Sequence, residues 1–318
     1  MEKFDNYFEQ ISSINNIVVT SDEFMAAFHG IQNCVKRSIA YKEPIGSMLL
    51  AKGGLGKTTL CKAIVSQMPK SFKIEEDHKK TIIPAFYVEV PSPATIKSLA
   101  ITMLHELGDP TYNNGTTSYL TDRLSYLLKM CETKLVFLDE FHHLFERKQS
   151  YTRMNSTIGN WLKTLVNQTG ISFCLVGLPE FSELLQVDSQ IARRFPFIYT
   201  LNPLYIESPQ GHGTIYAFLS EIARKMAQQN ISFSPPLDNP LMGMQIYTAT
   251  QGYHSYIISL IRESIVNALN EGRLIVNKSD FSTAWELGIT DYISKLNSDP
   301  FKMPSSQLAV KVKVRGQI

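Results

Sequence analysis

Residues 47–61, SMLLAKGGLGKTTLC, decide the fold of this chain. The apolar run Met48–Leu50 predicts a buried strand, and the apolar periodicity that begins at Leu60 predicts a helix. Between the two lies a glycine-rich turn whose members are Lys52, Gly53, Gly54, Leu55, Gly56, Lys57, Thr58 and Thr59. Glycines allow backbone N–H groups to close around phosphate oxygens, and a helix N-terminus adds partial positive charge. The stretch therefore predicts a loop that binds phosphate groups.

Two side chains of this loop carry the predicted chemistry. Lys57 is placed to reach the β- and γ-phosphates of a nucleotide, and Thr58 is placed to bind Mg²⁺. The loop departs from the usual pattern G-x-x-x-x-G-K-[ST] at one position, because Ala51 stands where the pattern has its first glycine. Alanine is small enough for that place. The sequence thus predicts a nucleoside triphosphate and Mg²⁺ as ligands.

A second stretch, LVFLDE at residues 135–140, supplies two carboxylates. Its apolar run predicts a strand buried on both faces, and the strand ends at Asp139 and Glu140. Carboxylates at the end of a buried strand are costly unless they meet a cation or activate a water molecule. In a nucleoside triphosphatase, Asp139 would hold Mg²⁺ through its water shell and Glu140 would polarise the attacking water.

The composition is that of a globular protein with room for one large domain and a smaller one. The 318 residues are 44% hydrophobic and 19% charged. The sequence has no apolar run long enough to span a membrane, and its start, MEKFDNYFEQ, does not have the form of a signal peptide. We therefore predict no membrane contact and a cytoplasmic location. The four cysteines are widely spaced in apolar stretches, which predicts reduced core residues.

The pattern along the chain predicts four segments. Residues 1–19 form an N-terminal arm. Residues 20–203 alternate buried strands with amphipathic helices, which predicts an α/β domain with a parallel sheet and helices on both faces. Helical stripes dominate residues 204–296, so we expect a small all-helical lid subdomain. Residues 297–318 form a basic tail without an acid from residue 302 on, and its cations are Lys302, Lys311, Lys313 and Arg315.

One lysine of the α/β segment stands at a helix start. Residues 69–80 are predicted as a charged surface turn, followed by a strand over residues 82–90 and a helix over residues 95–107. Lys97 lies off the apolar stripe of this helix and in its first turn, where its charge opposes the helix dipole by roughly 0.3–1 kcal/mol. A cation there favours an anionic neighbour, and a solvated surface lysine is the alternative interpretation.

Arg193 and Arg194 follow the core strands and precede the helical segment. We interpret one of them as an arginine finger that reaches the γ-phosphate bound by a neighbouring subunit, where such a residue is worth roughly 10³–10⁵ in rate. This interpretation requires an oligomer. The alternative is an ordinary pair of surface arginines.

His142 and His143 directly follow the two carboxylates. Adjacent histidines on a helix face different directions, and no cysteine or histidine has the spacing of a further metal ligand. We therefore predict that both are structural, or that they sense the nucleotide state through Glu140.

The chain resembles the AAA+ ATPases of the TnsC/TniB group, which regulate transposition in Tn-type and CRISPR-associated transposons. The resemblance covers nearly the whole chain and rests on AKGGLGKTTL, VEVPSPATIKSLAITMLHELGDP, LVFLDEFHHLF, ISFCLVGLPEF with SQIARRF, and TATQGYHSYIISLIRESIVNAL. It implies a bacterial P-loop ATPase that uses ATP and Mg²⁺ and assembles into rings or helical filaments around double-stranded DNA. Such a protein links a target selector of the TniQ or TnsD type to a DDE transposase of the TnsB type.

The resemblance also assigns residues. It implies DNA contacts at Lys97, in agreement with the dipole argument, and at Thr116. The strand that ends at Gly177 offers no Asn or Thr in the sensor-1 place, and the sequence at residues 252–255, GYHS, lacks the arginine that many AAA+ proteins have there as sensor 2. We therefore expect slow hydrolysis that acts as a switch.

Two other functions match parts of the sequence. A DExH helicase has A-x-x-G-x-G-K-T and D-E-F-H as its first two motifs, but it also needs a second lobe with its own parallel sheet. A nucleotide-bound scaffold that never hydrolyses ATP is the other alternative. Intact Lys57, Asp139 and Glu140 argue against the scaffold.

Overall fold

The computed structural model describes residues 21–75, 78–92, 94–146, 153–154, 156–183, 189–207 and 212–312. The chain divides into two compact units, one of which is Asp22–Leu201 and the other of which includes Asn202–Ile318. The predicted arm, residues 1–19, lies outside the described residues, as do Lys313 and Arg315 of the predicted tail.

The unit Asp22–Leu201 is built on a five-stranded sheet in which all neighbouring strands are parallel. In spatial order, its strands are β4 (Ala85–Glu89), β5 (Leu135–Asp139), β8 (Ser172–Gly177), β1 (Ser47–Leu50) and β9 (Phe197–Thr200). Every residue of β1, β5 and β8 is buried. This is the pattern of a parallel sheet covered on both faces, and the predicted α/β fold is confirmed.

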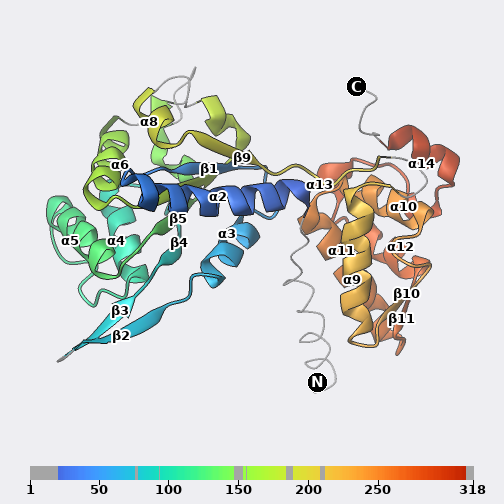
Figure 1. Ribbon diagram of the computed structural model, residues 1–318. Coiled ribbons are helices and arrows are strands. Elements are labelled where there is room, and N and C mark those ends of the chain that lie inside the picture. Colours follow the sequence, from blue (N-terminus) through green and yellow to red (C-terminus); the bar gives the residue numbers. More distant parts are fainter. Residues whose placement is uncertain are drawn as a thin grey trace. The chain divides into compact units, whose positions relative to one another are not determined.

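Helices cover the sheet (Figure 1). They are α2 (Asp22–Tyr41), α3 (Lys57–Ser66), α4 (Ile96–Glu106), α5 (Thr117–Met130), α6 (Ser156–Thr169) and α8 (Ser189–Arg194), with the short 3-10 helices η2 (Phe141–Leu144) and η3 (Pro179–Glu183). Buried residues of α4, α5 and α6 share one hydrophobic cluster with alternate residues of β1, β4, β5 and β8. Because strand side chains alternate between faces, the remaining ones, Tyr87 and Asp139 among them, point to the other face.

The segment predicted as a charged surface turn, residues 69–80, is instead a hairpin. Strands β2 (Ser71–Glu75) and β3 (His78–Ile82) pair antiparallel and extend away from the sheet (Figure 1). Lys73 and Lys80 face each other across the pair, and both contact the Glu132 carboxylate, at 2.6 and 3.0 Å. These ion pairs with Glu132, in the turn after α5, stabilise the hairpin. Its strands are too polar to be predicted from the sequence. Strands β6 (Phe145–Glu146) and β7 (Arg153–Met154) form a second short pair.

The described part of the unit Asn202–Ile318 is mostly helical. Its helices are α9 (Thr214–Ala227), α10 (Pro240–Thr250), α11 (His254–Asn270), α12 (Lys278–Glu286), α13 (Asp291–Ser294) and α14 (Ser305–Lys311), with the 3-10 helix η4 (Pro300–Lys302). The structure adds a two-stranded parallel pair, β10 (Ser232–Ser234) and β11 (Ile275–Asn277). A helicase lobe needs a larger parallel sheet, so the residues described here do not support the DExH alternative.

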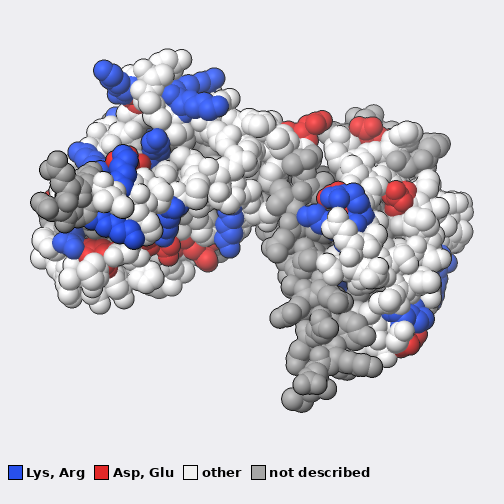
Figure 2. Space-filling view, turned by 60° about the horizontal axis from the view of Figure 1, so that its bottom comes forward, with Lys and Arg blue, Asp and Glu red and all other residues white. Residues whose placement is uncertain are grey.

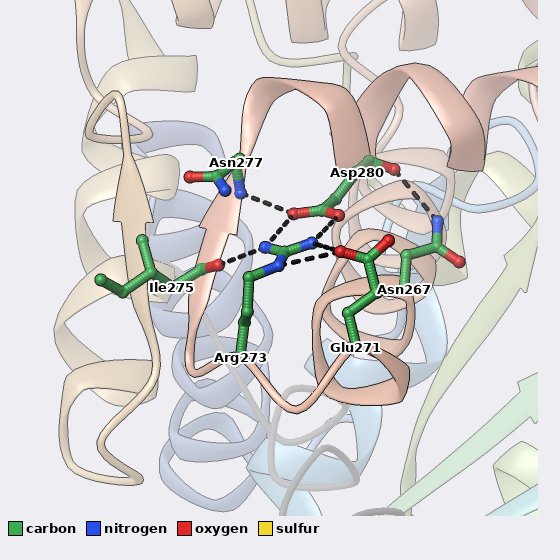
Figure 3. A network of polar contacts seen from close by, with 6 residues as sticks. All are labelled: Asn267, Glu271, Arg273, Ile275, Asn277 and Asp280. Carbon is green, nitrogen blue, oxygen red and sulfur yellow. Dashed lines mark hydrogen bonds and ion pairs between the residues drawn. The ribbon is translucent and has the colours of Figure 1, made fainter.

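A polar network joins β11 to α12 (Figure 3). The guanidinium of Arg273 donates to both carboxylate oxygens of Asp280, at 3.0 and 2.7 Å, and to the Glu271 carboxylate. The backbone N–H of Asn277 also donates to Asp280, at 2.6 Å, which anchors the first turn of α12. Asp280 is only 4% exposed, and these donors replace the water that its buried carboxylate would otherwise bind.

Asp280→Ala is expected to lower the free energy of unfolding by about 1–3 kcal/mol, because the partly buried donors of Arg273 and Asn277 lose the acceptor they share. Urea denaturation followed by circular dichroism measures the change. Glu271→Ala is the matched control, since it removes an exposed carboxylate from the same guanidinium and should cost less than about 1 kcal/mol. Equal losses in the two variants would contradict the role given to Asp280.

None of the helices in the described ranges is both long and apolar enough to cross a membrane.

Candidate nucleotide-binding site

The glycine-rich loop joins β1 to α3 in a conformation that needs glycine at two positions. Gly54 has φ 75°, and Gly56, the N-cap of α3, has φ 89°. Both values lie in the left-handed region, which residues with a Cβ rarely adopt. A Cβ built at Gly56 would meet no atom within 4 Å, so backbone conformation and not crowding requires this glycine. Leu55 is buried and anchors the loop, while the three residues before it, 52–54, are exposed.

Ala51 replaces the first glycine of the usual motif and is almost fully buried. Its N–H donates to the Gly177 carbonyl at the end of β8, at 3.0 Å. Its own carbonyl accepts a hydrogen bond from the Lys57 amine at 2.9 Å. Alanine is therefore compatible with a loop that is tied to the sheet on one side and to Lys57 on the other.

Lys57 is 6% exposed, which is unusual for a charged side chain. Its amine donates to the carbonyls of Ala51 and Lys52, at 2.9 and 3.3 Å. Both acceptors are neutral. A buried ammonium held by neutral carbonyls favours an anion beside it, and the first turn of α3 places unpaired backbone N–H groups next to the same loop.

Asp139 at the end of β5 is 2% exposed and accepts three hydrogen bonds. Thr58 Oγ1 and the Tyr87 hydroxyl both donate to its Oδ2, at 2.9 and 2.6 Å. The backbone N–H of Glu140 donates to its Oδ1 at 2.8 Å. The bond from Thr58 to Asp139 thus joins the glycine-rich loop to the end of β5, two segments that are far apart in the sequence.

Tyr87 was not predicted. It lies on β4, where Glu89 is the register partner of Asp139, so its side chain is a diagonal neighbour of the carboxylate on the same face. Burial, and then the bond to Asp139, raise the pKa of Tyr87 well above its usual value, so the hydroxyl keeps its proton and donates. Tyrosine is common on half-buried strands, and the sequence therefore carried no signal for this contact.

Glu140 follows the strand in a left-handed backbone conformation, with φ 52°. One oxygen of its carboxylate, Oε2, lies 2.9 Å from Nδ1 of His142 in η2. His143 instead faces the end of β4, where its Nδ1 lies 3.0 Å from the Val90 carbonyl. The two adjacent histidines thus point to different partners, and His142 shares the space around the predicted water-polarising carboxylate.

The two candidate finger residues end helix α8. Arg193 is exposed, whereas Arg194 is half-buried and its carbonyl accepts the Gly46 N–H at 2.6 Å. The side chain of the next residue, Phe195, is buried against Gly46. Among the described contacts, neither arginine reaches the cluster around Lys57 and Asp139 of its own chain.

The two candidate DNA-contacting residues lie at helix starts. Lys97 is the second residue of α4 and is exposed. Thr95 caps this helix, and its side chain accepts the Ser98 N–H at 3.0 Å. Thr116 is the exposed N-cap of α5 and accepts the Tyr119 N–H at 3.3 Å. The Lys97 charge therefore stands in a capped first turn, where the dipole disfavours it.

The residues present fit a nucleotide with its metal ion. Among the described residues, the groups hydrogen-bonded to Lys57 and to Asp139 are neutral. A buried charge favours an opposite charge, so the ammonium matches a phosphate and the carboxylate matches a divalent cation. The space at Gly53, where a Cβ would meet nothing within 4 Å, leaves room beside the backbone of the loop.

Solved structures with a similar fold include one with bound nucleotides and one in complex with DNA. The Orc2 protein of Aeropyrum pernix, solved with ADPNP and ADP, has a TM-score of 0.58 at 16% identity, over 85% of this chain and 68% of that one. The Orc1 protein of Aeropyrum pernix in complex with DNA gives 0.58 at 14% identity, over 85% and 66%. Cdc6p of Pyrobaculum aerophilum gives 0.59 at 15% identity, over 85% and 72%. These similarities show that the chain has the AAA+ fold of these proteins.

Comparisons by sequence give the family. No curated protein matches the sequence. The family model described as "Bacterial TniB protein" matches residues 23–201, which is more than half of the chain and includes the loop, both carboxylates and both arginines. The chain therefore belongs to the TniB family.

Proposed function

We propose that this protein is an ATPase that regulates transposition: it oligomerises on double-stranded DNA with ATP bound and couples target-site selection to a DDE transposase. The observation that carries the proposal is the bond from Thr58 to Asp139 next to the buried Lys57 amine, in a chain of the TniB family. In this proposal, residues 20–203 bind the nucleotide and DNA, residues 204–296 form the lid, and residues 297–318 form the tail. The protein would work in the bacterial cytoplasm, at the nucleoid when it is on DNA.

Each residue of the site has a role in ATP hydrolysis under this proposal. Residues 52–59 surround the phosphates with backbone N–H groups, and Lys57 turns its amine from the loop carbonyls to the β- and γ-phosphates. Mg²⁺, held by Thr58 and Asp139, would neutralise charge on the phosphates. Glu140 accepts a proton from the attacking water. The nearby His142 competes for the same carboxylate, which agrees with slow hydrolysis that acts as a switch.

DNA binding and assembly belong to the same proposal. Figure 2 shows Lys and Arg side chains predominating over Asp and Glu on the visible face of the unit Asp22–Leu201. A basic face favours a polyanionic partner. The protein would form a ring or a helical filament, because each subunit offers few contacts and many subunits must act together. A TnsB-like transposase and a TniQ- or TnsD-like target selector would be its protein partners.

Lys97→Ala tests the DNA part of the proposal. We expect wild-type protein to bind duplex DNA more tightly with ATP than with ADP, with little dependence on sequence and a steep loss of affinity as salt rises. Lys97→Ala should weaken binding far more than one contact in a monomer would, because the loss is repeated in every subunit. Fluorescence anisotropy over a salt titration, with ATP present, measures both the affinity and the slope.

Lys129→Ala is the matched control, since Lys129 is an exposed lysine in the last turn of α5, where its charge agrees with the helix dipole. It should leave DNA affinity close to that of the wild type. Thr116→Ala should weaken binding less than Lys97→Ala, because it removes no charge. If Lys97→Ala keeps the wild-type affinity and salt slope, the DNA surface lies elsewhere, with the basic tail as the next candidate.

A further inference from the structure

We propose that Tyr87 is a positioning residue for metal binding: its hydroxyl holds the Asp139 carboxylate in the orientation that acts with Thr58 on Mg²⁺. This inference rests on the proposed ATPase function and adds to it a residue that lies outside both nucleotide-binding motifs. Tyr87 would not touch the nucleotide. It would act through Asp139.

The geometry around Asp139 carries the inference. Its Oδ2 accepts two side-chain hydrogen bonds, from Thr58 Oγ1 at 2.9 Å and from the Tyr87 hydroxyl at 2.6 Å. Its Oδ1 accepts the Glu140 N–H at 2.8 Å. Donors on both oxygens fix the rotation of the carboxylate about its Cβ–Cγ bond, and hydrogen bonds to a charged acceptor are the strong ones. The bond from Tyr87 is the shortest of the three.

The three donors belong to different elements. Thr58 stands on α3, Glu140 follows β5 directly, and Tyr87 comes from β4, the neighbouring strand. The ring of Tyr87 also lies under α3, with the Lys62 amine 5.8 Å from its centroid. Tyr87 therefore connects the edge strand of the sheet to the helix that begins at the phosphate-binding loop.

The donors differ in what else they must do. Thr58 is itself a predicted metal ligand, so its oxygen is shared between the metal and Asp139. The Glu140 N–H belongs to the backbone and moves with the residue that activates water. Tyr87 neither binds the metal nor activates water, so its hydroxyl can hold Asp139 in place throughout the nucleotide cycle. Outer-shell partners of this kind typically change metal affinity by 10–100-fold when they are removed.

Tyr87→Phe tests the inference because it removes the hydroxyl and keeps the ring. The experiment titrates MgCl₂ into protein with a fluorescent ATP analogue and records the binding signal, and the Mg²⁺-dependent rise in melting temperature is measured in parallel. We expect the half-saturating Mg²⁺ concentration to rise by about 10-fold or more. Affinity for the analogue in EDTA should not change, because the loop and Lys57 are intact.

Tyr199→Phe is the matched control. Tyr199 lies on β9 of the same sheet, and its partly buried hydroxyl contacts the Cys34 thiol and not Asp139. This variant should keep the wild-type Mg²⁺ dependence. In an Asp139→Asn background, Tyr87→Phe should cause no further shift, because the two residues act as one unit.

Two results would overturn the inference while the proposed ATPase function stands: a Mg²⁺ dependence of Tyr87→Phe equal to that of Tyr199→Phe, or a shift that persists unchanged in the Asp139→Asn background. Wild-type protein that binds the ATP analogue without any dependence on Mg²⁺ would overturn both the inference and the proposed function.

Discussion

Glu140→Gln is expected to lower the rate of ATP hydrolysis by about 10²–10⁴-fold, the usual contribution of a general base. The substitution keeps the size of the side chain and removes the negative charge that would accept a proton from water. Lys57, Thr58 and Asp139 are unchanged, so ATP should still bind, and the ATP-dependent assembly on DNA should persist longer than in the wild type. Phosphate release, with and without duplex DNA, measures the rate.

Two further variants separate chemistry from binding. Lys57→Ala should abolish ATP binding itself, because the buried ammonium opposite the phosphates is lost. His142→Ala removes the neighbour 2.9 Å from the Glu140 carboxylate and should not slow hydrolysis.

A Glu140→Gln protein that turns over ATP at the wild-type rate would refute the role given to Glu140. A wild-type protein that releases no phosphate would favour the non-hydrolysing scaffold.

Arg193→Ala is expected to lower hydrolysis by roughly 10³–10⁵-fold, the range measured for arginine fingers. Affinity of the monomer for ATP should change little, because the finger acts on the nucleotide of the neighbouring subunit. Of the two adjacent arginines, Arg193 is the exposed one, whereas Arg194 is half-buried and its backbone carbonyl accepts the Gly46 N–H. Arg194→Ala is therefore the matched control and should lose less activity.

A mixing experiment identifies the subunit boundary. Arg193→Ala protein has an intact loop and no finger, and Lys57→Ala protein has a finger and no nucleotide. Mixed assemblies should recover part of the activity at interfaces where the two intact halves meet. If neither arginine variant loses activity even at high protein concentration, the finger is a different residue.

Local patterns were sufficient to predict the elements that carry the site. A buried strand, a glycine-rich turn and a helix are consecutive in residues 47–66. The position of Lys57 beside the loop backbone therefore follows from its place in the chain. The run before Asp139 is short, apolar and ended by charge, which is the pattern of a strand buried on both faces. Both predictions depend on neighbours in the sequence, and the structure contains the predicted elements: strand β1, helix α3 and strand β5.

Other elements were missed for identifiable reasons. Helix α10 is buried at every position from Met242 to Thr250, so it has no polar face and no stripe that a periodicity could detect. Near the end of the segment predicted as helical, residues 204–296, the chain forms two separate helices, α12 and α13, and Gly288 between them has φ 77°. The sequence predicts a turn at the β2–β3 hairpin because charged residues dominate it. The charges of Lys73 and Lys80 are balanced by Glu132, a residue distant in sequence.

The sequence by itself determined the family and the α/β fold, and it predicted the residues that would meet phosphate and metal, because each of these depends on residue types at fixed local spacing. Only the tertiary structure decided that β8 lies between β1 and β5, that Tyr87 donates to Asp139, and that Arg193 is more exposed than Arg194. The physical reason is that the alternation of side chains along a strand predicts the face of the sheet on which each one lies. Which side chains it contacts on that face depends on how strands far apart in the chain pair with one another.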